Sequence, residues 1–246
     1  MSENQSTRYS RHIALSRFGL KGQGRLSDSR VLIIGIGGLG SPIAIYLAAA
    51  GVGHLVLADF DRVELSNLQR QIIHTTHDLA RLKVESARDH LAALNPDIRI
   101  TPLARVLDEE ELFSEVSQAD VIVDATDNFE SRFELNRVCV QTKTPLVSGA
   151  AIRMEGQVTV FDARREDSPC YRCLYSDEIE EGETCAQVGV LSPLLGIIGG
   201  IQATETLKIL TSTGDALIGR VIFLDAFGME LRTMKLRRDP SCPVCG

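Results

Sequence analysis

Short apolar runs alternate with amphipathic stretches along the first 150 residues. The runs have the length and β-branched content of buried strands, and the stretches between them have helical periodicity. We expect strands at 31–36, 54–59, 98–103, 121–124 and 145–148, and helices at 39–51, 79–93, 108–116 and 129–140, after one or two short helices within 8–26. Strands that alternate with helices are typical of an α/β fold with a doubly wound, Rossmann-like, mostly parallel sheet.

The pattern changes after Ser148. Apolar and polar residues alternate over 156–161, 221–225 and 231–236, which predicts half-exposed strands that extend the sheet in antiparallel fashion. Residues 193–210 are apolar on most faces, so we expect a helix buried in the core and in a homodimer interface. We expect one domain over residues 1–246, with a nucleotide-binding half at 1–150, and at 151–246 the antiparallel extension, a mobile acidic loop at 176–183 and a zinc site.

Composition and charge limit the partners and the cellular compartment that we expect for this protein. The net charge of −7 argues against non-specific nucleic-acid binding, and the basic segment 232–238 is interpreted as a solvated strand face. The apolar part of the longest uncharged stretch, 188–201, is too short to cross a bilayer. The polar N-terminus has no signal-peptide core. We therefore expect a cytoplasmic protein that binds neither nucleic acid nor membrane.

Four of the six cysteines form two CxxC pairs, Cys170 with Cys173 and Cys242 with Cys245. Four thiolates in such pairs suit a tetrahedral, closed and therefore structural Zn²⁺ site. The zinc would join the C-terminal end to the segment that follows strand 156–161. The alternatives are a thioredoxin-like redox pair or unrelated free thiols. Neither pair precedes a helix in a thioredoxin-like β-α pattern, which favours zinc.

Two histidines also have a spacing found in metal sites. His74 and His77 form an HxxH pair with Asp78 adjacent, but nothing nearby in the sequence completes a site. We expect these residues to be solvated or to cap a helix.

A glycine-rich loop at 35–40 follows a buried strand and opens a helix. Glycines there allow a phosphate to approach the backbone, and the helix N-terminus offers free N–H groups. Asp59 ends the next strand, roughly 20 residues on, where a ribose-binding carboxylate belongs. The loop alone is a weak signal. Arg70 and Lys83 sharpen it, because a site that cleaves a triphosphate needs cations and a nicotinamide site has no obvious need for them.

Five motifs in this order resemble the MoeB/ThiF/HesA family of adenylyltransferases, which are related to ubiquitin-activating enzymes. They are Gly35-x-Gly37-Gly38-Leu39-Gly40, Asp59-x-Asp61, Ser66-Asn67-Leu68-Gln69-Arg70-Gln71, Asp124-Ala125-Thr126-Asp127-Asn128 and the two CxxC pairs. The resemblance covers residues 8–246. It implies a homodimer with two active sites, in which ATP reacts with the C-terminal carboxylate of a ubiquitin-like sulfur carrier ending in Gly-Gly. The products are an acyl adenylate and pyrophosphate.

The resemblance also implies a role for each motif residue. Gly38 would approach the phosphates, Asp59 would bind the ribose, and Lys83 would neutralise charge that develops during displacement. Asn67 and Arg70 would bind phosphate oxygens, and Ser66, Leu68 and Gln69 would line the same site. Asp127 would bind Mg²⁺ with Asn128 beside it, and Arg11 would reach in from the other subunit. Fixed Arg, Lys and Mg²⁺ stabilise the charge of an α-phosphoryl transition state.

Each assignment has a simpler alternative. Arg70 and Lys83 could be exposed helix charges, Asp127 could be the N-cap of the helix near 129, and Arg11 could pair with a surface carboxylate. Cys185 is either a reactive thiol that links covalently to the carrier or a passive one. The acidic residues around it would raise its pKa, so we do not include it in the site.

Different segments of the sequence resemble two different branches of the family. Segments 83–89 and 147–157 resemble the molybdopterin-synthase branch, which acts on a MoaD-like carrier, and the end of the chain at 242–246 resembles the thiamine-thiazole branch, which acts on a ThiS-like carrier. We favour the former. Two other classes stay open: an NAD-dependent oxidoreductase, and a non-catalytic scaffold that binds the carrier.

Overall fold

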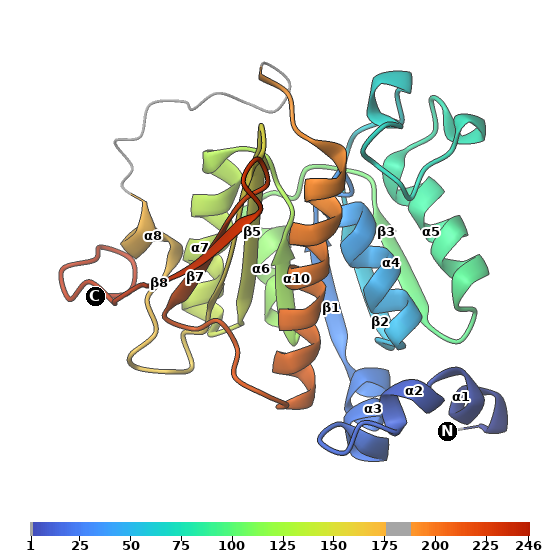
Figure 1. Ribbon diagram of the computed structural model, residues 1–246, viewed down its shortest axis with the longest axis horizontal. Coiled ribbons are helices and arrows are strands. Elements are labelled where there is room, and N and C mark those ends of the chain that lie inside the picture. Colours follow the sequence, from blue (N-terminus) through green and yellow to red (C-terminus); the bar gives the residue numbers. More distant parts are fainter. Residues whose placement is uncertain (1, 176–187) are drawn as a thin grey trace.

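The computed structural model describes residues 2–175 and 188–246. In this part of the chain eight strands form a sheet with the order β3-β2-β1-β4-β5-β6-β7-β8 (Figure 1). The strands are β1 (Arg30–Ile34), β2 (His54–Ala58), β3 (Arg99–Leu103), β4 (Val121–Asp124), β5 (Leu146–Ile152), β6 (Glu155–Phe161), β7 (Arg220–Asp225) and β8 (Glu230–Lys235). Pairing is parallel from β3 to β5 and antiparallel from β5 to β8, which confirms the expected fold class.

Helices cover both faces of the sheet. Helices α3, α4, α5 and α10 pack on one face, and α6, α7 and α8 lie on the other (Figure 1). The described helices are α1 (Glu3–Arg8), α2 (Ser10–Ile13), α3 (Gly19–Asp28), α4 (Gly40–Ala50), α5 (Lys83–Leu94), α6 (Glu109–Ser117), α7 (Phe129–Thr142), α8 (Tyr171–Leu174) and α10 (Ser192–Thr211), with 3₁₀ turns η1 (Leu65–Asn67) and η2 (Thr76–Asp78). Within the described residues, no helix is both long and apolar enough to span a bilayer.

The parallel strands are apolar throughout because both faces of the sheet are covered. Val31 and Ile33 point into the core beneath α4 and α10, whereas Leu32, between them, points into the core beneath α7. Successive side chains of a strand point to opposite faces of the sheet, and here each face is covered by an apolar layer.

Helix α10 is buried against the sheet and α4, as expected for its core contacts. Glycines make its close approach possible: a Cβ on Gly156 would lie 2.5 Å from Ile198 Cγ1, and a Cβ on Gly199 would lie 2.7 Å from Pro42 Cγ. The glycines within and facing α10 therefore serve packing. A larger residue at either position would force the helix away from its neighbours.

The strand order creates a topological switch point between β1 and β4, where binding sites are found in this kind of fold. Strands β1 and β4 are parallel neighbours, but α4 leaves β1 on one face of the sheet and α7 leaves β4 on the other. Ligands bind outside the carboxyl ends of the strands at such a switch point. The expected glycine loop follows β1 there, and the expected Asp127 loop follows β4.

Some element boundaries differ from the sequence-based expectations. The two short helices expected within 8–26 are α2 and α3, and a further helix, α1, precedes them; β5 continues to Ile152, and the helix expected from residue 79 begins at Lys83. Ala80 has a left-handed φ of 67°, and its N–H bonds to the Val63 carbonyl at 2.9 Å. Residues 79–82 are therefore tied to a neighbouring loop instead of the helix. The acidic segment at 176–183 and Cys185 lie outside the described residues.

Candidate nucleotide site and cysteine cluster

The glycine loop after β1 has a backbone that only glycine accommodates well. Gly35 has a φ of +91°, and a Cβ on Gly40 would lie 2.0 Å from the Gly35 carbonyl oxygen. A Cβ on Gly38 would lie 2.5 Å from Leu195 Cδ1. Among the described residues, no hydrogen-bond acceptor is paired with the N–H of Gly37 or Gly38. These partly exposed donors at the start of α4 form an anion-binding surface.

Asp59 lies at the carboxyl end of β2, beside this loop. Its Oδ2 accepts the N–H of Ile36 at 2.7 Å, and its Oδ1 accepts the N–H of Asp61 at 2.8 Å. A carboxylate has about four acceptor positions, so each oxygen can still accept a hydroxyl. The geometry fits both a structural anchor for the loop and a ribose-binding group.

Lys83 is the first residue of α5, and its side chain is buried against Asp61. Only 6 % of the residue is exposed, and its Nζ lies 2.7 Å from Asp61 Oδ2. The alternative that Lys83 is an exposed helix charge is therefore wrong. A buried cation at the positive end of a helix is unfavourable on its own, and Asp61 offsets that cost. Asp61 is half-exposed, so the pair opens toward solvent.

The segment at 66–71 folds into the 3₁₀ turn η1 and the turn that follows it. Arg70 Nη1 donates to the Ser66 carbonyl at 2.9 Å, and Asn67 Nδ2 donates to Ser66 Oγ at 3.4 Å. The Gln69 carbonyl accepts the Ser192 hydroxyl at 2.6 Å, which joins the segment to α10. Leu68 is half-buried in the same turn.

Gln71 is a further site residue that the sequence analysis quoted but gave no role. It is 4 % exposed, and its Nε2 lies 3.6 Å from the position a Cβ on Gly37 would occupy. Its Oε1 is buried with no hydrogen-bond partner among the described residues. A buried, unsatisfied amide beside the glycine loop marks Gln71 as a candidate ligand contact. The only sequence signal was its place at the end of the 66–71 motif.

The loop after β4 lies against the glycine loop, because a Cβ on Gly35 would lie 2.7 Å from the Ala125 carbonyl oxygen. Asn128 is the N-cap of α7, where its Oδ1 accepts the N–H of Ser131 at 2.8 Å. The alternative that Asp127 caps this helix is therefore wrong. Asp127 is exposed and has no partner within residues 2–175 and 188–246. Its carboxylate is available to a cation.

Asp124, at the end of β4, holds this loop in place. It is 1 % exposed and accepts hydrogen bonds from the Thr126 N–H at 3.0 Å and the Ser148 hydroxyl at 2.7 Å. It anchors the loop, and Asp127 projects from it.

Arg11 is the one expected site residue that the fold does not bring to the others. It lies on α2, which packs against α3, and α3 leads into the amino end of β1. The glycine loop is at the carboxyl end of β1, so the two lie at opposite ends of the sheet (Figure 1). Arg11 is exposed, and the described residues offer it no carboxylate partner.

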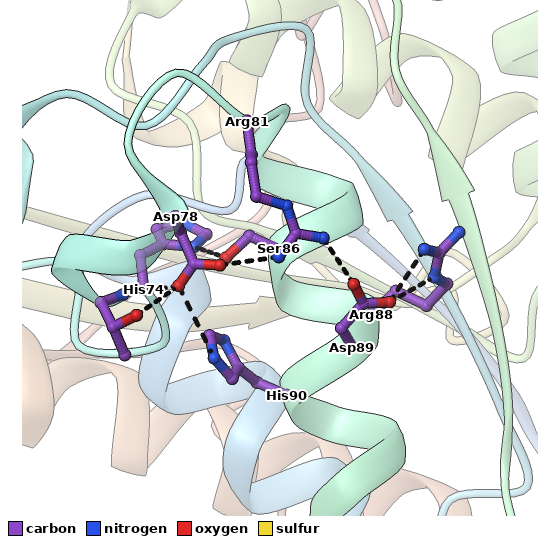
Figure 2. A network of polar contacts seen from close by, with 8 residues as sticks. His74, Asp78, Arg81, Ser86, Arg88, Asp89 and His90 are labelled. Carbon is purple, nitrogen blue, oxygen red and sulfur yellow. Dashed lines mark hydrogen bonds and ion pairs between the residues drawn. The ribbon is translucent and has the colours of Figure 1, made fainter.

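We expected His74 and His77 to be solvated or to cap a helix. This is wrong for His74 and right for His77. His77 is exposed, but His74 is only 5 % exposed and lies in a polar network with Asp78 and Ser86 (Figure 2). The network joins the turn at η2 to α5.

The four CxxC cysteines converge. Their Sγ atoms all lie within 4.8 Å of one another, with Cys170 and Cys242 3.7 Å apart and Cys173 and Cys245 3.5 Å apart. A tetrahedral site with Zn–S bonds of about 2.3 Å requires S–S separations of about 3.8 Å.

The surroundings of the cysteine cluster shift its thiols in opposite directions: burial raises the pKa of Cys170, and it raises the pKa of Cys245 to about 11. The N–H of Asp239 lies 3.4 Å from Cys173 Sγ. Burial raises the pKa of Cys242, but the backbone N–H groups of Cys245 and Val244 lower it to about 7. The first pair begins the one-turn helix α8, which the sequence analysis did not predict. The donor set and its spacing fit a closed Cys₄ zinc site.

Comparison with known proteins places these features in a family context. The model of the ThiF family matches residues 9–244. The chain is 49 % identical to the molybdopterin-synthase adenylyltransferase of Escherichia coli, over all of this chain and 98 % of that protein. It is 46 % identical to the sulfur carrier protein ThiS adenylyltransferase of E. coli, over all of this chain and 97 % of that protein. The crystal structure of E. coli MccB with ATP has the same fold, with a TM-score of 0.86 at 23 % identity over 97 % of this chain and 73 % of that one.

Proposed function

The chain belongs to the ThiF family, and on that premise we propose that it adenylates the C-terminal glycine carboxylate of a ubiquitin-like sulfur carrier, using ATP. The observation that carries the proposal is the convergence of the glycine loop, the Lys83–Asp61 pair and the Asp127 loop at one switch point. We favour a MoaD-like carrier and molybdenum-cofactor synthesis, since the identity is 49 % to the molybdopterin relative and 46 % to the thiamine relative. A ThiS-like carrier is the second candidate.

The proposed reaction is a single displacement at the α-phosphorus of ATP. A carboxylate oxygen of the carrier forms a bond to that phosphorus, and the bond to the oxygen that bridges to the β-phosphorus breaks. Pyrophosphate leaves with that oxygen, and the carrier keeps an acyl adenylate. No base is needed, because the carboxylate is already ionised at neutral pH.

In this proposal the described residues bind different parts of ATP. The free N–H groups of Gly37 and Gly38 bind phosphate, and Asp59 accepts ribose hydroxyls through its remaining lone pairs. Lys83 keeps one donor on Asp61 and turns its other two to the phosphates. Asn67 and Arg70 bind phosphate oxygens, and the buried Oε1 of Gln71 accepts a hydrogen bond from a hydroxyl or N–H group of the nucleoside.

Mg²⁺ and Zn²⁺ would bind at separate sites. Asp127 would hold Mg²⁺, which binds through one or two carboxylates plus substrate phosphates and offsets charge on the leaving pyrophosphate. Asn128 contributes through its cap, which fixes the start of α7. The cluster of Cys170, Cys173, Cys242 and Cys245 would hold structural Zn²⁺. Such reduced thiols are typical of a cytoplasmic setting.

A homodimer completes the proposal, because Arg11 lies far from the glycine loop of its own chain. A groove of about 400 Å³ runs between α2, α4 and α10. Its lining is small and apolar for the most part: His12, Tyr46, Ala49, Ala50, Gly200, Ala203, Thr204 and Leu207. Tyr46 is 57 % exposed there. We place the twofold interface on this face, from which each Arg11 would reach the other subunit's nucleotide.

The first test is ATP–pyrophosphate exchange by the purified, zinc-loaded protein with a MoaD-like and, separately, a ThiS-like carrier. We expect exchange with the MoaD-like carrier that disappears when its terminal glycine carboxylate is amidated. Exchange with only the ThiS-like carrier would reverse the branch. Exchange with neither, in a protein that binds ATP, would overturn the carrier assignment. Binding of NAD without ATP would instead favour an oxidoreductase, and carrier binding indifferent to ATP would favour a scaffold.

A further inference from the structure

His74 is a buried residue to which the proposed reaction gives no role. Its imidazole bridges two elements: Nε2 lies 3.3 Å from the Ile36 carbonyl oxygen, and Nδ1 lies 2.8 Å from Ser86 Oγ. Ile36 belongs to the glycine loop, and Ser86 to the first turn of α5, which begins at Lys83. His74 therefore connects the loop that would bind phosphate to the helix that carries the lysine. Figure 2 shows His74 beside Ser86 of this helix.

The contacts define the protons on the ring. A carbonyl oxygen only accepts, so Nε2 carries a proton and donates it to Ile36. Burial lowers the pKa of His74, more than the bond to Ile36 and the charges of Asp78 and Asp59 raise it, so the ring is neutral at pH 7. A neutral ring has one donor and one acceptor, and Nδ1 therefore accepts the Ser86 hydroxyl.

The peptide between Ile36 and Gly37 is held from inside by this bond. The N–H of Ile36 donates to Asp59 Oδ2 at 2.7 Å, and its carbonyl accepts from His74. In a planar trans peptide, the C=O and the N–H of the next residue point in opposite directions. Holding the Ile36 carbonyl inward therefore turns the N–H of Gly37, which has no acceptor among the described residues, outward and away from His74.

The backbone that carries His74 is itself fixed. Thr75, the next residue, donates its N–H at 2.8 Å and its hydroxyl at 2.7 Å to Asp78 Oδ2, and Arg81 donates to Asp78 Oδ1 at 2.8 Å. Arg81 also pairs with Asp89 on α5 (Figure 2). The imidazole is thus held on a segment braced against α5.

We propose that His74 is a positioning residue that aims the Gly37 N–H at a nucleotide phosphate. The proposal rests on the ATP site proposed above and adds a specific role within it. Its distinctive consequence is that loss of His74 weakens ligands that carry phosphate and leaves the bare nucleoside unaffected.

The test is equilibrium binding of Mg-ATP and of adenosine to the zinc-loaded full chain, by calorimetry and by competition. We expect His74→Asn, too short to reach Ile36, to weaken ATP about tenfold and adenosine less than about twofold, since the carbonyl loses its donor. His74→Gln, whose amide reaches about as far as Nε2, should stay within about threefold for ATP. His77→Asn, at an exposed position, is the matched control and should bind like the wild type.

Unchanged ATP binding by His74→Asn, or an equal loss of ATP and adenosine, would overturn the positioning role. If His74→Asn does not fold, the same binding measurements on Ser86→Ala and His74→Gln test the proposal. Ser86→Ala should weaken ATP about threefold with adenosine unchanged, and equal effects on both ligands would count against the proposal. A wild-type protein that does not bind ATP would instead overturn the proposed function, and this inference with it.

Discussion

Asp78 is an ionised carboxylate that the fold holds almost completely out of water, with 2 % of the residue exposed. Burial raises its pKa, but hydrogen bonds from the hydroxyl and N–H of Thr75 and the charge of His90 lower it further, to about 2. Folding therefore favours the charged form of this group. A pKa depressed in the folded state stabilises the protein above the unfolded pKa, and this stabilisation is lost as pH falls through the folded one.

We expect Asp78→Asn to lower the free energy of unfolding by about 2 kcal/mol at pH 7. The difference from the wild type should shrink as the pH falls from about 4 to about 2, because protonation then removes the same charge from the wild type. Urea unfolding followed from pH 7 to pH 3 measures it. Asp127→Asn, at an exposed carboxylate that has no partner among the described residues, is the control and should show no such dependence. A pH-independent gap for Asp78→Asn would refute the linkage.

Residues whose position follows from a motif were predictable, and residues buried by the fold were not. Asp59 follows a strand and a glycine loop, so its place beside that loop could be inferred from spacing. The burial of His74 depends on a loop between β2 and α5 folding back over Ile36. No local pattern in 72–78 encodes that contact, since polar residues there are equally compatible with a solvated turn.

Element boundaries show the same competition between local pattern and tertiary contact. Apolar periodicity from Leu79 onward predicts a helix start there. Instead, the Val63 carbonyl accepts the N–H of Ala80, the Val63 N–H donates to the Arg81 carbonyl, and the Asp61 carbonyl accepts the N–H of Lys83. Helix α5 therefore starts at Lys83, directly opposite Asp61. The strand positions and the antiparallel extension were predictable, because each apolar run is regular and bounded by turn residues. The order of the strands in the sheet was not predicted.

The cysteine cluster joins elements distant in sequence, namely α8 and the segment after β8. If one Zn²⁺ per chain binds there, Cys242→Ser should lose the metal and about 4 kcal/mol of stability at free zinc near a thousand times Kd, or roughly 8–16 °C in Tm. Metal analysis and thermal unfolding with and without a chelator measure this. Cys139→Ser should keep the metal, since Cys139 lies outside the cluster. Full metal content in Cys242→Ser would exclude the Cys₄ site.

At the scale of the whole molecule, the two ends of the sheet have different chemistry. The carboxyl ends of β1, β2 and β4 carry the glycine loop, Asp59 and the Asp127 loop, whereas α2 with Arg11 lies at the amino end of β1 (Figure 1). A chain acting alone would leave Arg11 unused. A twofold dimer is isologous, so whatever one Arg11 contributes to its partner, it receives in return.

This arrangement predicts complementation between two inactive variants. Arg11→Ala and Lys83→Ala should each lower exchange activity at least about a hundredfold as homodimers, since in the proposed mechanism each removes a cation that stabilises transition-state charge. A heterodimer of the two, isolated through different affinity tags, has one site with Lys83 from one chain and Arg11 from the other. It should recover about half of the wild-type activity, because its second site lacks both groups.

Whether the heterodimer forms, and how active it is, distinguishes the possible arrangements of Arg11. If Arg11 acted within its own chain, one site would lack Arg11 and the other Lys83, so the heterodimer would be as inactive as its parents. If the chain were monomeric, no heterodimer would be recovered. Arg165→Ala, at an exposed arginine paired with Asp167 near the cysteine cluster, is the control and should keep wild-type activity as a homodimer. Recovery to about half therefore requires both a dimer and an Arg11 that crosses it, which is the arrangement that the proposed dimer predicts.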